Sequence, residues 1–101
     1  MSDGDMPMAE ATVFIDNDRT RVTQWRFQAG AQTGWHRHEY DYVVVPTMDG
    51  RLRIVGPGNE ETVAEMKAGA PYFREVGVEH NVINANDGEY AFIEVEFKQA
   101  R

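Results

Sequence analysis

Apolar and polar residues alternate in short segments along most of this chain. In residues 21–28, Thr23, Trp25 and Phe27 fall on one face of an extended strand, following the two-residue period of a half-buried β-strand. Segments rich in β-branched and aromatic residues predict seven further strands, at 12–16, 40–45, 51–55, 61–66, 72–76, 81–84 and 90–98. No apolar period of about 3.6 residues lasts for three helical turns, so we expect little helix.

Turn residues separate these segments almost everywhere. Glycine and Asx residues, which tolerate positive φ, occur at 29–30, 49–50, 56–58, 68–69 and 87–88. The Asp49-Gly50 pair lies between two predicted strands and predicts a β-hairpin. Many short strands spaced about 8 to 12 residues apart are typical of an all-β sandwich or barrel.

The chain has the size and composition of one globular domain. It contains 101 residues, of which 42% are hydrophobic and 27% are charged. Residues 1–10 show no period, so we expect a flexible N-terminal arm followed by a single domain at 11–101. No segment approaches the length of a membrane span, and the first ten residues lack the features of a signal peptide. We therefore expect a cytoplasmic protein without a membrane partner.

Charge and cysteine content narrow the possible functions. Seventeen acidic against ten basic residues give a net charge of −7, which would repel the phosphate backbone of a nucleic acid. Nucleic acid is therefore not an expected partner. The absence of cysteine excludes disulfides, thiolate metal ligands and a cysteine nucleophile.

Two of the three histidines lie one residue apart in the stretch GWHRHEYDY. On a strand, His36 and His38 would point to the same face, which is a geometry that suits metal ligands. Taken alone, this pair fits ordinary surface or core histidines equally well. The third histidine, His80, follows two further predicted strands and would have to be brought to the pair by the fold. Neutral imidazoles suit Fe, Mn, Zn or Ni, and three of them leave coordination positions for water or substrate.

Two spaced motifs carry a resemblance to a known family. The first runs from Gly30 through five residues to the histidine pair, and the second comprises Gly69, Gly77, His80 and Asn84. In these motifs the chain resembles the cupins, and around HRHEYDYVVVP it is similar to the small cupins named for β-alanine degradation. The resemblance implies a double-stranded β-helix, a jelly-roll-like barrel of two packed sheets. It also implies that His36, His38 and His80 are ligands of one divalent transition metal inside one end of the barrel.

The match departs from the family pattern at several positions. Tyr42 stands where the family carries a glutamate ligand, Glu75 replaces the proline of the second motif, and Gly50 comes one residue late. The neighbouring Asp41 has the wrong parity to point inward unless the strand contains a bulge. A three-histidine site without a carboxylate is the favoured interpretation, and the alternative is that Asp41 or Glu39 completes the site.

The roles of four aromatic and basic side chains can also be predicted, and two of them, Tyr42 and Arg26, have two possible roles. Tyr42 is either a core aromatic or a hydrogen-bond donor beside bound substrate, and it is the candidate catalytic residue. Trp25 and Phe27 are predicted core residues. Arg26, on the other face of that strand, is either solvated or binds a carboxylate group of an anionic substrate.

Two segments, the predicted strand at 90–98 and the valines at 43–45, indicate which strand faces lie on the surface of the domain. Glu94 and Glu96 alternate with apolar residues, and we expect them to form a solvated strand face. Residues 43–45 are valines and therefore apolar on both faces of their strand. Such a strand needs cover on its outer side, so we expect a homodimer.

Two classes of function remain open from the sequence. The first is a metal-dependent enzyme that acts on a small, anionic organic metabolite, of dioxygenase-type oxidoreductase or isomerase and lyase type. Vacant positions on a three-histidine metal favour this class. The second is a non-catalytic, metal-dependent module that binds or senses a small molecule. We expect the enzyme, although no second acid or base can be placed in the site from the sequence.

Overall fold

The computed structural model describes residues 6–98 of the chain. These residues form nine β-strands and a 3₁₀ turn at Pro57–Asn59, with no α-helix among them. The strands are β1 (Glu10–Asp16), β2 (Thr20–Phe27), β3 (His36–Arg37), β4 (Asp41–Pro46), β5 (Gly50–Val55), β6 (Glu61–Met66), β7 (Tyr72–Arg74), β8 (Glu79–Asn84) and β9 (Tyr90–Phe97). No helix among these residues is long and apolar enough to span a membrane.

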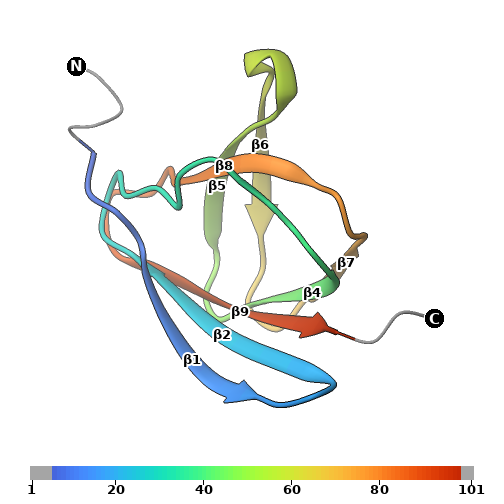
Figure 1. The fold of residues 1–101 in the computed structure, drawn as a ribbon. Helices are drawn as coiled ribbons and strands as arrows, with labels where there is room; N and C mark the ends of the chain where they lie inside the picture. Colours follow the sequence, from blue (N-terminus) through green and yellow to red (C-terminus); the bar gives the residue numbers. More distant parts are fainter. Residues whose placement is uncertain (1–5, 99–101) are drawn as a thin grey trace.

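The strands form two antiparallel sheets that face each other (Figure 1). One sheet has the order β1-β2-β9-β4-β7, and the other has the order β3-β8-β5-β6. Strands distant in sequence are neighbours in both, because β9 lies between β2 and β4 and β8 lies between β3 and β5. The predicted all-β barrel with little helix is therefore confirmed.

The predicted strands agree with the observed ones to within about two residues at most ends. The strand predicted at 61–66 has the bounds of β6, whereas β7 ends at Arg74, two residues before the predicted end. The two-residue strand β3 was not predicted, because so short a segment carries no measurable alternation. It is nevertheless the strand that carries His36.

The predicted hairpin at Asp49-Gly50 is wrong. The flanking strands β4 and β5 belong to different sheets, so the turn passes from one sheet to the other. Gly50 does not adopt positive φ, and a Cβ atom at this position would lie 2.8 Å from the side chains of Asn86 and Tyr90. The glycine is therefore needed for close packing, whereas a tight hairpin turn would have required a left-handed backbone.

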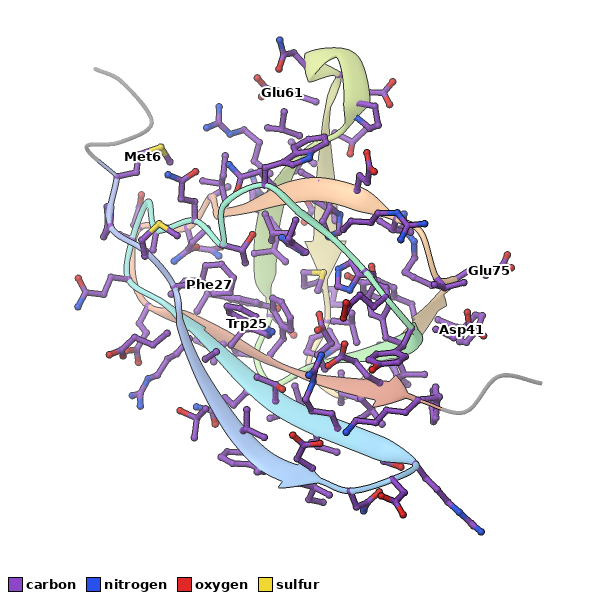
Figure 2. All side chains as sticks on the ribbon, viewed as in Figure 1. Met6, Trp25, Phe27, Asp41, Glu61 and Glu75 are labelled. Atoms are coloured by element: carbon purple, nitrogen blue, oxygen red, sulfur yellow. The ribbon has the colours of Figure 1, made fainter. Side chains whose placement is uncertain are left out.

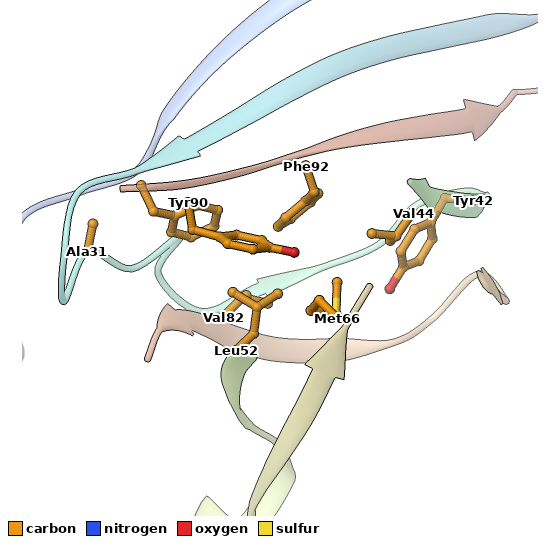
Figure 3. Close-up of a cluster of buried hydrophobic side chains, with 9 residues drawn as sticks. Ala31, Tyr42, Val44, Leu52, Met66, Val82, Tyr90 and Phe92 are labelled. Carbon is orange, nitrogen blue, oxygen red and sulfur yellow. The ribbon is translucent and has the colours of Figure 1, made fainter. Parts of the chain in front are cut away.

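Inward-facing side chains fill the space between the sheets. Figure 2 shows Trp25 and Phe27 between the sheets, whereas Glu61 and Glu75 lie at the periphery. Phe27 is fully buried, and its ring contacts that of Phe92 at a centroid distance of 5.6 Å. The buried cluster extends to Val44 and Tyr42 at one end, as Figure 3 shows. Phe27 is thus a core residue as predicted, and Trp25 is packed against the cluster but only partly buried.

The predicted N-terminal arm lies partly outside the described residues. Of its remaining part, Pro7 and Ala9 hydrogen-bond through their backbones to Gln32, and Glu10 begins β1. The peptide groups of residues 7 and 9 are therefore attached to the barrel.

An apolar row crosses the outer face of the five-stranded sheet. Cross-strand pairing places its members in line, one from each strand: Ile15, Val22, Val95, Val43 and Phe73. Ile15 and Phe73 are exposed, and the three valines between them are half-buried. Isolated apolar residues are common on protein surfaces, whereas a continuous apolar row across five strands is uncommon and is typical of an interaction surface.

Candidate metal centre

The three histidines converge at one end of the barrel. β3 pairs with β8 in a register that places His36 opposite His80, and His38 follows one residue beyond β3. His36 Nε2 lies 3.0 Å from His38 Nε2, which lies 3.1 Å from His80 Nε2. Strand pairing therefore brings together side chains that are 42 or more residues apart in the sequence.

A backbone contact sets the tautomer of His36. Its Nδ1 lies 2.9 Å from the carbonyl oxygen of Gly34, which can only accept a hydrogen bond. Nδ1 therefore carries the proton, which leaves the lone pair on Nε2, the atom that lies 3.0 Å from His38 Nε2. Gly34 is itself held by a bond from its backbone N–H to the Asn81 side-chain oxygen, at 2.9 Å, and it adopts a φ of 86°.

Burial keeps the other two imidazoles neutral. His38 and His80 are each 6% exposed. Burial, together with the nearby His36, lowers the pKa of His38 to about 4 and that of His80 to about 3. Both side chains are therefore uncharged at neutral pH, which is the form that binds a metal.

The donor set fits a single transition-metal ion. Two nitrogens that each lie about 2.1 Å from one ion are about 3.0 Å apart when they subtend about 90° at it, and about 3.4 Å apart at a tetrahedral angle. The two Nε2 separations agree with ligands that share one ion, and potential ligand atoms of all three histidines lie within 4.8 Å of one another. Lone pairs that point at each other repel unless a proton or a cation lies between them, so this arrangement suits His36, His38 and His80 as ligands of one ion.

Tyr42 lies beside the histidines, and Asp41 does not. The Tyr42 ring is 2% exposed and stacks on the His38 ring. The β4–β9 pairing is continuous through both residues, so no bulge turns Asp41 inward. Figure 2 shows Asp41 at the periphery, where its carboxylate accepts a hydrogen bond from the Val76 backbone N–H at 2.8 Å. Glu39 is exposed and lies outside the histidine cluster.

The prediction that Glu94 and Glu96 form a solvated face is wrong. They are 7% and 5% exposed and point into the barrel, and each has a carboxylate oxygen within reach of the His38 ring nitrogens. The apolar neighbours Ile93 and Val95 form the outer face instead. Alternation showed that Glu94 and Glu96 share one face of β9, but it did not show which face points inward. The aromatic residues Tyr90 and Phe92 lie on the same face as the glutamates and are buried, so their position in the sequence could have indicated that this face points inward.

The two buried glutamates have different surroundings. Glu96 accepts two hydrogen bonds from the Arg21 guanidinium, at 2.7 and 3.0 Å, and is neutralised by it. Burial, followed by the nearby charge of Glu96, raises the pKa of Glu94 to about 7, although a hydrogen bond with Trp25 opposes the shift. Glu94 is therefore a carboxyl group that can exchange a proton near neutral pH. Neither Glu94, Glu96 nor Arg21 was singled out as a site residue from the sequence.

Arg26 is not part of the site. Its guanidinium forms a surface ion pair with Glu89, at 3.1 Å for each of two hydrogen bonds. Side-chain alternation along β2 places Arg26 on the outer face and Arg21 on the inner one, because the bonded pair Arg21 and Glu96 face each other across the strands. Of the two possibilities open from the sequence, the structure shows the solvated one.

Two spaces adjoin the histidines. An inner cavity of about 20 Å³ reaches the hydrophobic core, and an outer pocket of about 310 Å³ lies on the other side. Both are lined by Trp25, Thr33, His36 and Glu94. The inner cavity has room for only one or two water-sized groups. A small molecule could therefore lie against the histidines with most of its volume in the outer pocket.

Comparison with known proteins identifies relatives over nearly the whole chain. The chain is 52% identical over 92 residues to the β-alanine degradation protein BauB of Pseudomonas aeruginosa, covering 91% of this chain and 96% of that protein. A cupin domain from Bordetella pertussis shares 49% identity and a TM-score of 0.90, covering 93% of this chain and 97% of that domain. No protein-family model matches.

A more distant structure shows the same fold. A conserved protein with a double-stranded β-helix domain from Klebsiella pneumoniae has a TM-score of 0.74 at 20% identity, covering 97% of this chain and 81% of that one. At that identity the match concerns the fold alone. Three observations support the same family: the pairing of β3 with β8 brings the histidines together, the histidine motifs resemble those of cupins, and two relatives share about half of the sequence. The chain belongs to the cupin superfamily, among the small cupins similar to BauB.

Proposed function

We propose that this cupin is a metal-dependent enzyme that acts on a small anionic metabolite, and that its substrate belongs to β-alanine degradation. The observation that carries the proposal is the convergence of three Nε2 atoms at 3.0 and 3.1 Å, on imidazoles of which two are kept neutral by burial. The pathway is suggested by the name of the relative that is 52% identical. A cytoplasmic location is part of the same proposal.

His36, His38 and His80 would hold one Fe, Mn, Zn or Ni ion. When bound, such an ion would supply Lewis acidity with positions open to substrate and, for iron, oxidative chemistry of the dioxygenase type. The absence of cysteine leaves imidazole and carboxylate as the available side-chain ligands of this region. A three-histidine site fits this chain better than one completed by Asp41, which is engaged by Val76.

Glu94 is the best placed group to move a proton. It lines both spaces beside the histidines, whereas the other buried carboxylate, Glu96, is held by Arg21. A carboxylate in this position could accept a proton from substrate and return it to the product. Enclosure on the core side would limit access of bulk water to that step.

Tyr42 would act on the inner side of the site. Burial raises the pKa of its phenol well above the ordinary value, so the hydroxyl keeps its proton at neutral pH. It lines the inner cavity and could donate a hydrogen bond to a substrate oxygen. Stacking on His38 also limits the rotation of that imidazole.

Reconstitution with each candidate metal tests this proposal. The metal-free protein is loaded separately with Fe²⁺, Mn²⁺, Zn²⁺ and Ni²⁺ and incubated with short carboxylic acids, β-alanine among them, while products are followed by mass spectrometry and oxygen by electrode. Turnover that requires metal and is abolished in His80→Ala is the expected result. Metal binding with ligand binding but no conversion would favour the alternative, a non-catalytic binding module. Failure to bind any of the metals would reject the metal site.

A further inference from the structure

Among residues 6–98, one inward-facing arginine forms no ion pair. The chain has ten basic side chains, one of which, Arg101, lies outside the described residues. Seven of the remaining nine form ion pairs with carboxylates: Arg21, Arg26, Arg37, Arg51, Arg53, Lys67 and Lys98. The other two are Arg19, which is exposed, and Arg74, which is half-buried. Within residues 6–98, we find no ion pair or hydrogen bond of the Arg74 guanidinium.

Arg74 lies at the candidate metal centre. It pairs with Tyr42 across β7 and β4, and alternation along β7 directs it inward while Phe73 is 54% exposed on the outer face. Its side chain lines the inner cavity together with His36 and His80. Its positive charge also contributes, after burial and the neighbouring histidines, to the low pKa of His80.

The second inward-facing arginine, Arg21, differs from Arg74 because it is paired with a carboxylate. Arg21 donates two hydrogen bonds to Glu96, which satisfies its charge within the protein. Arg74 shares the inner cavity with Glu94 but forms no ion pair with it. A half-buried guanidinium that is not paired loses hydration without gaining a bonded anion, so the site around Arg74 can accept one. Carboxylates and phosphates both present two oxygens that match the guanidinium fork.

We propose that Arg74 binds the carboxylate of the substrate and orients its other end toward the three histidines. This inference rests on the proposed function and specifies its substrate class. Because the inner cavity offers only about 20 Å³, the anionic group is a carboxylate and not the bulkier phosphate. The substrate is a short-chain monocarboxylate with a second polar group, whose chain reaches past His36 toward the outer pocket.

The experiment is a titration with propionate and with its neutral analogue propionamide. Binding to wild type, Arg74→Gln and Arg74→Lys is measured by calorimetry, with the protein both metal-free and loaded with Zn²⁺. Charge-assisted hydrogen bonds predict that Arg74→Gln weakens propionate binding about 10-fold or more, with a smaller loss in Arg74→Lys. Propionamide should bind weakly to all three proteins. The matched control is Arg51→Gln, which removes an exposed arginine paired with Glu65 and should bind propionate as wild type does.

A second readout follows the Arg74 side chain directly in the wild-type protein. The side-chain Nε–H signal of Arg74, assigned by its absence in Arg74→Gln or Arg74→Lys, should shift in the NMR spectrum on addition of propionate and not of propionamide. Equal propionate affinity in wild type and Arg74→Gln, or an Nε–H signal that does not shift, would overturn the role of Arg74. The metal-free arm separates the two proposals. Loss of metal binding with Arg74-dependent propionate binding intact would reject the metal site alone, whereas intact metal binding without that dependence would reject the role of Arg74 alone.

Discussion

The phenol ring of Tyr42 stacks on the imidazole of His38, with ring centroids 3.9 Å apart and planes inclined by 16°. Tyr42 stands at the position where the cupin pattern has a glutamate ligand. Here Tyr42 lies beside Val44 at one end of the buried cluster, as Figure 3 shows. Its ring also contacts His38. The ring therefore joins the core to the candidate metal centre, and it contributes packing where a ligand would have contributed charge.

Metal content should depend on the histidines and not on the adjacent hydroxyl or carboxylate. His36→Ala and His80→Ala should each lose most of the bound metal, because either change removes one of three converging nitrogens. Tyr42→Phe should retain it, and Asp41→Asn should have little effect. Elemental analysis of protein purified without a chelating tag measures this. Loss of metal in Asp41→Asn would favour the carboxylate-completed site, and unchanged metal in the histidine variants would reject the site altogether.

Removal of the Tyr42 ring should destabilise the domain. The side chain is 2% exposed, so Tyr42→Ala should lower the free energy of unfolding by about 3 to 5 kcal/mol through lost burial and a residual cavity. Tyr42→Phe keeps the ring and the stacking on His38 and should cost much less. Urea unfolding of metal-free protein separates the two variants. Equal stability of both would show that packing of the ring is unimportant.

The metal-free protein should become less stable in mild acid because of His38 and His80. Their pKa values, about 4 and about 3 in the folded state, lie below the ordinary value of 6.5, so the unfolded chain takes up protons first. Their contribution to stability is fully present above about pH 6.5 and is lost as the pH falls toward 4 and below. In His80→Gln, the decrease in unfolding free energy between pH 6.5 and 4 should be smaller. An identical pH dependence in variant and wild type would contradict the low pKa of His80.

Glu94 should make the protein less stable as the pH rises, which is the opposite of the effect of His38 and His80. Its folded pKa of about 7 exceeds the ordinary value of 4.5, so the folded state binds the proton first and is weakened as the pH rises through 7. Glu94→Gln removes this charge and should be more stable than wild type at pH 8, by about 1 to 3 kcal/mol. The difference should vanish near pH 4.5. Unfolding curves at several pH values test this, and a constant difference would show that Glu94 does not titrate in this range.

The homodimer expected from the sequence remains a prediction. The apolar row on the outer face, with Val43 at its centre and the exposed Phe73 at one end, is the surface we expect a second copy to cover. Sedimentation at micromolar concentration should give a dimer. Phe73→Glu should shift the equilibrium toward monomer without changing the far-UV circular dichroism spectrum. A wild-type monomer under these conditions would contradict the prediction.

The sequence by itself determined the positions of most strands and the faces of the histidines. Side-chain alternation is a local property of an extended backbone, so the parity of His36, His38 and Tyr42 followed from their spacing. The resemblance of the two motifs to those of cupins likewise implied that His80 would join the pair, as it does through the register of β3 and β8.

Only the tertiary structure decided which face of each strand points inward and which strands are neighbours. Glu94 and Glu96 looked solvated because a carboxylate is seldom buried, yet Arg21, 75 residues from Glu96, makes that burial possible. Asp49-Gly50 looked like a hairpin turn because the pattern cannot show that its flanking strands join different sheets. The place of Arg74 beside the histidines likewise depends on the pairing of β7 with β4. Long-range pairing and charge compensation are properties of the assembled barrel, and local patterns do not encode them.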